Sequence, residues 1–287
     1  MTDAVDRVVA AVEDVARDLR TGIATRRGAA GEVNPSGERS KAADRYADDL
    51  LAKALATLDA VGWVASEERE DPVAAGDGSL AVTIVPLDGS SNVASNNLVG
   101  TVFGVFDGPL PAGGDDLLAA GYVLYCPVTT AVVARDGRVT ETLVADDGTK
   151  TLDDDVRLPA DPTVYGFGGR VLDWTDAFRA FAEEVRADES MKLRYGGAMV
   201  GDVNQVLAYG DVFSYPALRS APDGKLRSQF EAVPVAAVVE AAGGTSSDGE
   251  RSLLSGAPAD LHERTPVHLG DAGLVEGVER ALSAGES

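Results

Sequence analysis

Four groups of acidic residues each lie next to an apolar stretch, where the end of a strand or helix would hold a carboxylate in place. They are Glu38 with Asp44, Glu67 with Glu68, Asp88, and Glu231. Adjacent carboxylates such as Glu67 and Glu68, which follow the apolar WVAS, raise each other's pKa unless a cation neutralises them. Mg²⁺ prefers such hard oxygen ligands, completed by waters and substrate phosphate. The alternative interpretation of the two glutamates is a solvated surface turn.

The stretch PLDGSSN, residues 86–92, follows the apolar LAVTIV and combines several features of a phosphate site. Asp88 offers a carboxylate, and Gly89 has no Cβ to keep a ligand away from the backbone. The N–H groups of Ser90 and Ser91 can face a phosphate at the start of a helix. By itself D-G-S-S also fits an ordinary β-turn. Together with the glutamates, it predicts that a metal and a phosphate meet here.

Two amphipathic helices are predicted before these motifs. Val5, Val8, Val12, Ala16 and Leu19 recur at helical spacing, and a second apolar face runs from Ala43 to Leu58 after a start at Ser40. From about Trp63 the sequence changes to short β-rich runs separated by Gly, Asp and Pro, which predicts a sheet of mostly sequence-adjacent strands.

The Asp- and Pro-rich stretch 147–162 has little apolar periodicity and predicts a boundary or an exposed crossing. Strand-like and helix-like runs alternate after it, including helices over 174–185, 199–209 and 272–284, which is typical of α/β packing. We therefore expect two subdomains, residues 1–160 with the metal and phosphate motifs and residues 161–287 as an α/β unit that binds substrate.

Composition limits the class of protein. The 287 residues carry 25 basic and 47 acidic side chains, a net charge of −22, which disfavours nucleic acid and anionic membranes as partners. Lysine is rare while Asp and Glu are abundant, a pattern that indicates a high-salt cytoplasm; the alternative is an ordinary acidic protein. Cys126 is the only cysteine, which excludes an internal disulfide and a cysteine zinc cage. With no signal peptide or apolar span recognisable, we expect a cytoplasmic protein.

Seven blocks resemble class I fructose-1,6-bisphosphatase, of the Mg-dependent sugar and inositol phosphatase superfamily, in order and spacing. They are NPSGERSKAAD, VASEERE, PLDGSSNVASNNLVGTVFGVF, AGYVLY, LRYGGAMVGDVNQVLAYGDVFSYP, GKLRSQFEAVPVAAVVEAAGG and PADLHERTPVHLG. Inositol-monophosphatase-type enzymes lack the G-K-L-R block, so the sugar bisphosphatase branch fits better. The resemblance implies an α/β fold of layers αβαβα in two subdomains. It also implies hydrolysis of the 1-phosphate of fructose 1,6-bisphosphate in gluconeogenesis.

The resemblance also implies roles for individual residues. Glu67, Asp88 and Glu231 match carboxylates that bind two or three Mg²⁺ per subunit, with Mn²⁺ as a possible substitute, and Leu87 matches a residue whose carbonyl oxygen reaches a second metal. Glu68 and Asp44 match a pair that helps activate the attacking water, and Glu38 matches a carboxylate that closes over a further metal.

The substrate-binding residues follow in the same way. Asp88, Gly89, Ser90 and Ser91 match the turn that grips the departing phosphate. Four further residues match family residues that bind the distal phosphate and sugar: Arg194, Tyr195, Tyr215 and Lys225. Met199 and Arg227 fall in the same region. Because Arg194 corresponds to a side chain from the neighbouring subunit, the resemblance implies a homo-oligomer, a dimer or tetramer. His262 and His268 are expected to be structural or exposed.

The sequence departs from the family at three places. Val85 replaces an aspartate that normally bridges metals, so we expect weakened or altered metal binding without damage to the fold. In VYGFGGRV, Phe167 and Arg170 fall near the positions of an asparagine and a tyrosine that bind the distal phosphate. Ala94 replaces a frequent acid. Two other functions therefore stay open: a catalytically weakened paralogue that binds sugar phosphate, and a phosphatase for another sugar bisphosphate or for inositol phosphates.

Overall fold

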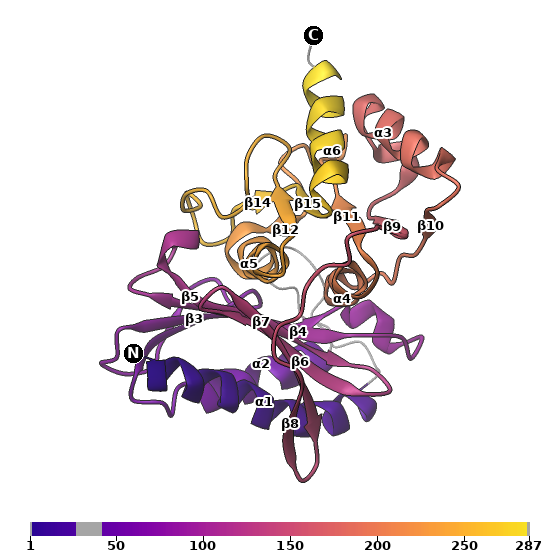
Figure 1. Ribbon diagram of the computed structural model, residues 1–287. Coiled ribbons are helices and arrows are strands. Elements are labelled where there is room, and N and C mark those ends of the chain that lie inside the picture. Colours follow the sequence, from indigo (N-terminus) through magenta and orange to yellow (C-terminus); the bar gives the residue numbers. More distant parts are fainter. Residues whose placement is uncertain (1, 27–41, 286–287) are drawn as a thin grey trace.

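Helices and sheets alternate in five layers (Figure 1). The computed structural model describes residues 2–26 and 42–285. From one side to the other, the layers are α1 with α2, a large sheet, α4 with α5, a small sheet, and α3 with α6. The helices span α1 Thr2–Ala24, α2 Ala42–Leu55, α3 Asp176–Ala187, α4 Met199–Tyr209, α5 Val233–Ala241 and α6 Ala272–Gly285. This is the αβαβα order that the sequence predicts.

The large sheet has eight strands in the order β2-β1-β3-β4-β5-β6-β7-β8. Their bounds are β1 Val61–Ser66, β2 Val73–Ala74, β3 Leu80–Asp88, β4 Gly100–Asp107, β5 Leu117–Tyr125, β6 Thr129–Arg135, β7 Arg138–Ala145 and β8 Gly148–Asp153. Strands β3 to β8 pair with their sequence neighbours in antiparallel ladders, as the sequence predicts. Strands β1 and β3 pair in parallel, so their carboxyl ends meet at one edge of the sheet.

The stretch predicted to be a boundary or an exposed crossing contains a strand that the sequence did not indicate. Within residues 147–162, β8 occupies 148–153 and pairs with β7 at the sheet edge. Five of its six residues are exposed, so the strand lacks the apolar alternation by which a half-buried strand is recognised in a sequence. Backbone hydrogen bonds to β7 are sufficient to form this edge strand.

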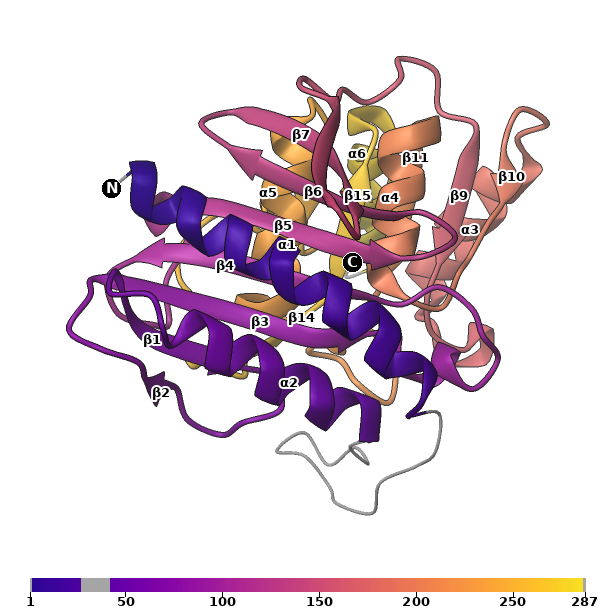
Figure 2. The same cartoon turned by 90° about the horizontal axis from the view of Figure 1, so that it is seen from below.

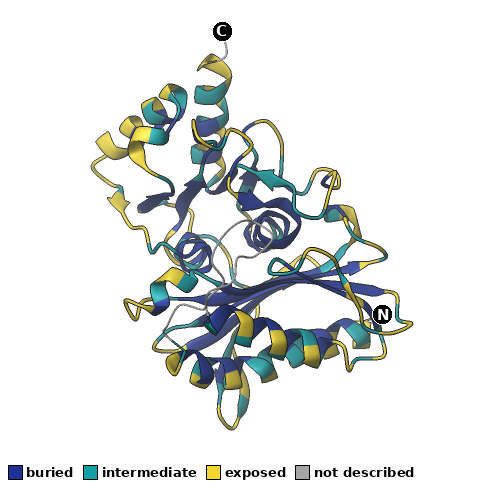
Figure 3. Cartoon of the chain, turned by 180° about the vertical axis from the view of Figure 1, so that it is seen from behind, coloured by how far each residue is buried: buried dark blue, intermediate teal, exposed yellow. Residues whose placement is uncertain are grey.

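Helices α1 and α2 cover one face of the large sheet (Figure 2). Val5, Val8, Val12, Ala16 and Leu19 are buried, as their helical spacing predicts, and they pack with residues of α2, β1 and β3 in one core. The opposite side of each helix faces solvent (Figure 3). A single apolar stripe therefore suffices for this outer layer.

Helices α4 and α5 lie between the two sheets and are buried nearly all round (Figure 3). The sequence of α5, VPVAAVVEA, is apolar on almost every side because both neighbouring layers are sheets. These helices share a core with the large sheet, including Val85 and Val102, and with Phe213 and Leu269 of the small sheet. Helix α4 has the bounds that the sequence predicts, Met199–Tyr209.

The small sheet has the order β10-β9-β11-β15-β13. Its strands are β9 Val164–Phe167, β10 Lys192–Leu193, β11 Asp211–Tyr215, β13 Thr245–Ser247 and β15 Val267–Gly270, and β12 Leu226–Arg227 pairs separately with β14 Arg264–Thr265. Outside the sheet, α3 begins after Thr175, whose hydroxyl accepts the Phe178 N–H at 3.2 Å. Phe167 packs edge-on against Trp174 and Phe178 there, so its side chain belongs to the core.

Candidate active site

An irregularity in β3 directs Asp88 to the site. The β3–β4 ladder pairs Val85 with Val102 and Asp88 with Gly100, so two residues of β3 lie opposite one of β4. This β-bulge changes the alternation of the side chains. Val85 packs into the core on the α4 and α5 side, while Leu87, two residues later, packs into the core on the α1 and α2 side. Asp88 then meets the beginning of α4.

Asp88 is held by the amino terminus of α4. The Val200 N–H donates to Asp88 Oδ2 at 2.8 Å, and the N–H groups of Gly89 and Met199 also stabilise the carboxylate. Burial outweighs these hydrogen bonds and raises the pKa of Asp88 to about 6. The carboxyl group is therefore fixed in position, and its ionised form is less favourable than that of an exposed aspartate.

Gly89 permits the turn after Asp88. Its φ of +70° is left-handed, and a Cβ there would lie 2.2 Å from the Ala198 Cβ. Both observations require glycine at this position. The short helix η1, Ser90–Val93, follows, and its Asn92 N–H donates to the Gly89 carbonyl at 2.7 Å. Ser90 and Ser91 lie in this turn, and Ser91 is exposed.

Arg227 connects the two predicted glutamate sites. Its guanidinium forms an ion pair with Glu67, which directly follows β1, and the two side chains are only 6% and 16% exposed. The Arg227 N–H donates to Glu231 Oε2 at 2.6 Å. Glu231 lies in a π-helical turn, η4, Ser228–Ala232, that leads into α5. One residue thus contacts carboxylates from both halves of the chain.

The carboxylates destabilise each other as anions. Burial raises the pKa of Glu67 well above its ordinary value, and Glu231, Glu68 and Asp88 raise it further against the opposing effect of Arg227. Burial raises the pKa of Glu231 to about 7, and Asp88 contributes to this rise. Glu67, Glu68, Asp88 and Glu231 therefore form one acidic cluster that needs positive charge.

The donor set fits a hard divalent cation, because it consists of carboxylate oxygens. Within residues 2–26 and 42–285, however, no three His, Cys, Asp or Glu side chains are placed to hold one ion. Arg227 supplies the positive charge next to Glu67 in this arrangement.

Of the other predicted catalytic residues, Glu68 lies beside Glu67, Asp44 lies in α2, and Glu38 lies outside the described part. The Glu68 N–H donates to the Ser66 hydroxyl at 3.3 Å, next to Glu67. Asp44 is buried in the first turn of α2, which packs on β1 and β3. Glu38 and the predicted helix start at Ser40 lie outside the described residues.

The residues predicted for the distal phosphate come from the small-sheet side. Burial raises the pKa of Tyr195 to about 12, with Tyr215, Asp202 and Asp88 contributing, so Tyr195 lies within electrostatic range of the acidic cluster. Lys225 is exposed just before β12. The Arg194 guanidinium lies 4.6 Å from the centre of the Tyr209 ring of its own chain, and Arg194 is exposed.

Sequence reasoning gave too little weight to some residues and missed others. Arg227 was expected only to line the region, yet it pairs with Glu67 at the centre. Met199 packs its side chain into the core and contributes its N–H to Asp88. Asn92 and Asp202, which were not predicted, bind the carbonyl and the N–H of Gly196. Their positions beside the DGSS and GG motifs were the available signal.

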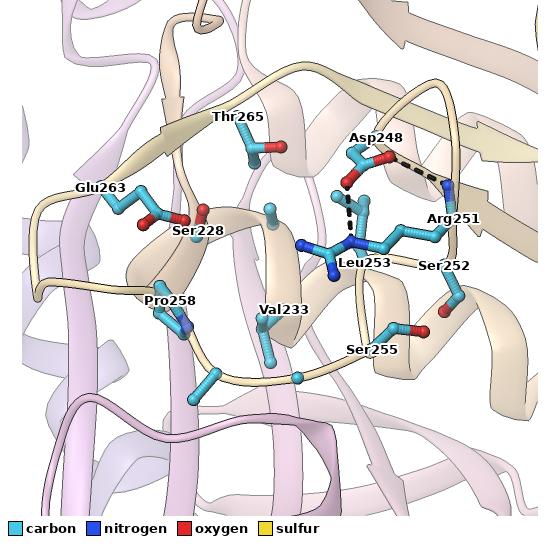
Figure 4. A pocket seen from close by; sticks show the side chains of 13 residues that line it. Ser228, Val233, Asp248, Arg251, Ser252, Leu253, Ser255, Pro258, Glu263 and Thr265 are labelled. Atoms are coloured by element: carbon cyan, nitrogen blue, oxygen red, sulfur yellow. Dashed lines mark hydrogen bonds and ion pairs between the residues drawn. The ribbon is translucent and has the colours of Figure 1, made fainter.

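A small cavity of about 50 Å³ adjoins the other side of the η4 turn (Figure 4). Ser228, Glu263 and Thr265 line it, and Arg251 extends into it from a loop where it pairs with Asp248. None of the predicted catalytic, metal-binding or substrate-binding residues lines this cavity. It is therefore separate from the acidic cluster.

Five alternating layers of helices and sheets, with acidic strand ends beside a glycine turn, are the arrangement expected of a metal-assisted phosphatase. Family models described as the N-terminal and C-terminal domains of fructose-1-6-bisphosphatase match residues 1–152 and 158–283. The chain belongs to the fructose-1,6-bisphosphatase family, as the resemblance in sequence implied. No helix in the described part is long and apolar enough to span a membrane.

Proteins of this family match the sequence over almost its full length. Fructose-1,6-bisphosphatase class 1 of Natronomonas pharaonis is 56% identical over 284 residues, covering 98% of this chain and all of that protein. The protein of the same name from Halobacterium salinarum is 55% identical, with 98% of each chain covered. The crystal structure of Leishmania major fructose-1,6-bisphosphatase in holo form matches with a TM-score of 0.89 at 26% identity, covering 99% of this chain and 93% of that one.

Proposed function

We propose that this chain hydrolyses the 1-phosphate of fructose 1,6-bisphosphate to give fructose 6-phosphate, a reaction of gluconeogenesis. The observation that carries the proposal is the acidic cluster itself. Carboxylates from the end of β1, the end of β3 and the η4 turn lie within electrostatic range of each other, beside a glycine turn suited to phosphate. Relatives at 56% and 55% identity that are named for this activity support it.

We further propose Mg²⁺ as the cofactor, two or three ions per subunit, with Mn²⁺ as a substitute. Glu67, Asp88, Glu231 and the Leu87 carbonyl would hold the ions. When bound, Mg²⁺ would neutralise the carboxylates and stabilise charge on the attacking and leaving oxygens. Its binding would release Arg227 from Glu67, making the guanidinium available to a phosphate.

The chain's own groups position the reactants. The N–H groups after Gly89 and the hydroxyls of Ser90 and Ser91 would bind the departing phosphate. Glu68 and Asp44 would orient the attacking water and accept its proton, and Glu38 would close the site from the segment before α2. Tyr195, Tyr215, Lys225 and Arg194 would hold the distal phosphate and sugar, which supplies binding energy away from the reacting bond.

Residues 1–160 would serve as the metal and phosphate subdomain and residues 161–287 as the substrate-binding subdomain of a cytoplasmic homo-oligomer, a dimer or tetramer. The surface around Arg194 supports the oligomer. Leu193, Tyr195 and Tyr209 are 65%, 46% and 43% exposed, so apolar area surrounds this cation. Light scattering after size exclusion in molar KCl tests the number of subunits, and a monomer would contradict a shared Arg194.

The activity is tested by phosphate release from fructose 1,6-bisphosphate in molar KCl with Mg²⁺. We expect turnover that chelation abolishes and that Glu231→Gln lowers at least a hundredfold, because the variant keeps the shape but removes one charge. Glu263→Gln, on the separate cavity, is the matched control and should retain activity. Absence of turnover in the wild type under all metal conditions would contradict the proposal.

Val85 favours a second candidate function, that of a catalytically weakened member that binds sugar phosphate without efficient turnover. Its side chain is apolar and 1% exposed, in the strand that delivers Asp88. The same assay separates the candidates, since tight binding of fructose 6-phosphate with negligible turnover would support the weakened form. A higher kcat/KM for another sugar bisphosphate or for an inositol phosphate would instead revise the substrate.

A further inference from the structure

The Gly196 backbone is hydrogen-bonded on both sides, between the two segments proposed to bind phosphate. The Gly196 N–H donates to Asp202 Oδ1 at 2.6 Å, and the Gly196 carbonyl accepts from Asn92 Nδ2 at 2.9 Å. Asn92 and Gly196 are 104 positions apart in the chain. The two peptide groups that flank the Gly196 Cα are thus each held by a side chain from a different element, which fixes the backbone orientation at Gly196.

Each side of this contact adjoins a proposed substrate-binding segment. Asn92 directly follows Ser91 in η1, and its amide nitrogen also donates to the Leu98 carbonyl at 3.0 Å. Gly196 directly follows Tyr195, which is proposed to bind the distal part of the substrate. A shift of the Gly196 backbone would therefore move the departing-phosphate turn relative to the distal subsite.

Helix α4 also holds the departing-phosphate turn and the Gly196 segment in place relative to each other. Its first turn donates the Val200 N–H to Asp88 and presents the Asp202 carboxylate to Gly196. Asp202 is 2% exposed, and the Gln205 amide also donates to its Oδ1 at 3.3 Å. A Cβ on Gly196 would lie 2.9 Å from Leu98 Cδ2, so the backbone here is also closely packed.

We propose that the Gly196 backbone, held between Asn92 and Asp202, sets the spacing between the two phosphate subsites and thereby selects bisphosphate over monophosphate substrates. Asn92 and Asp202 are positioning residues here, because they act through Gly196. The proposal rests on the proposed roles of the DGSS turn and of the Tyr195 segment. It adds a physical basis for preferring a substrate that spans both.

The reason for selectivity is geometric. A monophosphate ester needs only the departing-phosphate turn and the acidic cluster, which the Gly196 backbone does not form. A bisphosphate gains the distal contacts only when both subsites stand at the correct separation. Small errors in such positioning reduce rates by one to two orders of magnitude, about 10- to 100-fold.

The test compares fructose 1,6-bisphosphate with fructose 1-phosphate, which lacks the distal phosphate, in wild type and in variants. Asn92→Asp keeps the shape but removes the Nδ2 donor to the Gly196 and Leu98 carbonyls, and Asp202→Leu removes the acceptor for the Gly196 N–H. Asp202→Asn can still present an oxygen to the Gly196 N–H and serves as the conservative variant. Ser95→Ala, in the same loop, removes only a hydroxyl that donates to the Asn92 main-chain carbonyl and is the matched control.

We expect Asn92→Asp and Asp202→Leu each to raise KM for the bisphosphate about tenfold while kcat/KM for fructose 1-phosphate stays within about twofold. Asp202→Asn and Ser95→Ala should keep the wild-type preference. Circular dichroism melting verifies the fold, and should Asp202→Leu fail to fold, Asn92→Asp and Asn92→Leu carry the test.

Two results would overturn the proposal. Equal losses for both substrates in Asn92→Asp, accompanied by a lower melting temperature, would indicate a purely structural contact. An unchanged preference in folded Asn92→Asp would show that the Gly196 backbone does not set the spacing. A wild type that hydrolyses neither substrate contradicts the proposed function as well, whereas a preference that survives in the variants contradicts the spacing role alone.

Discussion

Arg227 and Glu67 form a buried ion pair across 160 positions of sequence, joining the β12 end of one half to the β1 end of the other. The same arginine donates its N–H to Glu231. A positive side chain therefore neutralises part of the cluster that is proposed to bind metal. Without metal, this pair reduces the repulsion among the carboxylates.

Arg227→Met should destabilise the metal-free protein by about 3 kcal/mol, because it leaves Glu67 buried without its positive partner. Saturating Mg²⁺ should recover most of this loss, and the variant should bind Mg²⁺ more tightly than the wild type. Urea unfolding with and without Mg²⁺ measures the first effect and calorimetric titration the second. Arg227→Lys, which keeps the charge, is the control, and an equal loss in both conditions would contradict the exchange of cations.

Val85→Asp should tighten Mg²⁺ binding and raise the rate of phosphate release. The new carboxylate would project from β3 on the same side as Ala198, Met199 and Phe230, next to the η4 turn that carries Glu231. In metal-free buffer the variant should be less stable by several kcal/mol, since a charge replaces an apolar side chain that is 1% exposed.

The matched control for this change is Val85→Asn, which has the same shape as aspartate but no charge. It should lower stability without improving metal affinity. Calorimetry and a phosphate-release assay on both variants decide the matter. Identical Mg²⁺ affinity and turnover in Val85→Asp and wild type would show that position 85 does not face the metal site.

His268 should make the fold less stable in mild acid. It is fully buried on β15, with Nδ1 2.9 Å from the Ser214 hydroxyl, and burial lowers its pKa from 6.5 to about 4. The unfolded chain therefore takes up the proton first as pH falls. The stabilisation by neutral His268 is complete above pH 6.5 and decreases by about 3 kcal/mol towards pH 4.

His268→Asn tests this by difference. Whatever constant cost the smaller side chain adds, the stability of the variant relative to wild type should improve steadily as pH falls from 6.5 to 4. Denaturant unfolding across this range, with Ser214→Ala as a control that retains the imidazole, gives the measurement. Parallel pH curves for His268→Asn and wild type would refute the assignment.

Stability should also increase with KCl. The net charge of −22 makes the folded chain repel itself in dilute buffer, and molar salt shortens the Debye length to about 3 Å. Melting temperatures from 0.1 to 3 M KCl test this, with NaCl as a comparison that separates screening from a specific potassium effect. A midpoint that stays constant or falls would contradict it.

The spacing of apolar residues along the sequence predicted most helices and strands, because each of these elements depends mainly on residues close together in the sequence. Helix α4 has the predicted bounds, and the buried face of α1 follows its valine spacing. Strand β8 was missed because its side chains are exposed and only its backbone is paired. The sequence can reveal such an edge strand only through the partner strand, which is a tertiary property.

The acidic residues of the candidate site could be predicted from the sequence. The cation that pairs with them, Arg227, and the positioning residues Asn92 and Asp202 could not. Glu67, Asp88 and Glu231 are visible beside apolar runs and in the family motifs. The pairing of Arg227 with Glu67, and the hydrogen bond of Asn92 to the Gly196 carbonyl, depend on how two distant halves of the chain meet. No periodicity in the sequence contains that information.

The order of the strands has a consequence during synthesis. Strands β3 to β8 pair with successive neighbours, so the large sheet is formed from local hairpins and can assemble while later residues are still being made. At that stage Glu67 and Asp88 lack their partners Arg227, Glu231 and α4, which are synthesised more than a hundred residues later. A truncated or paused chain would expose acidic side chains without their positive partner and the apolar face of the large sheet that α4 and α5 later cover. This is the stage at which a chaperone or a protease would recognise the chain.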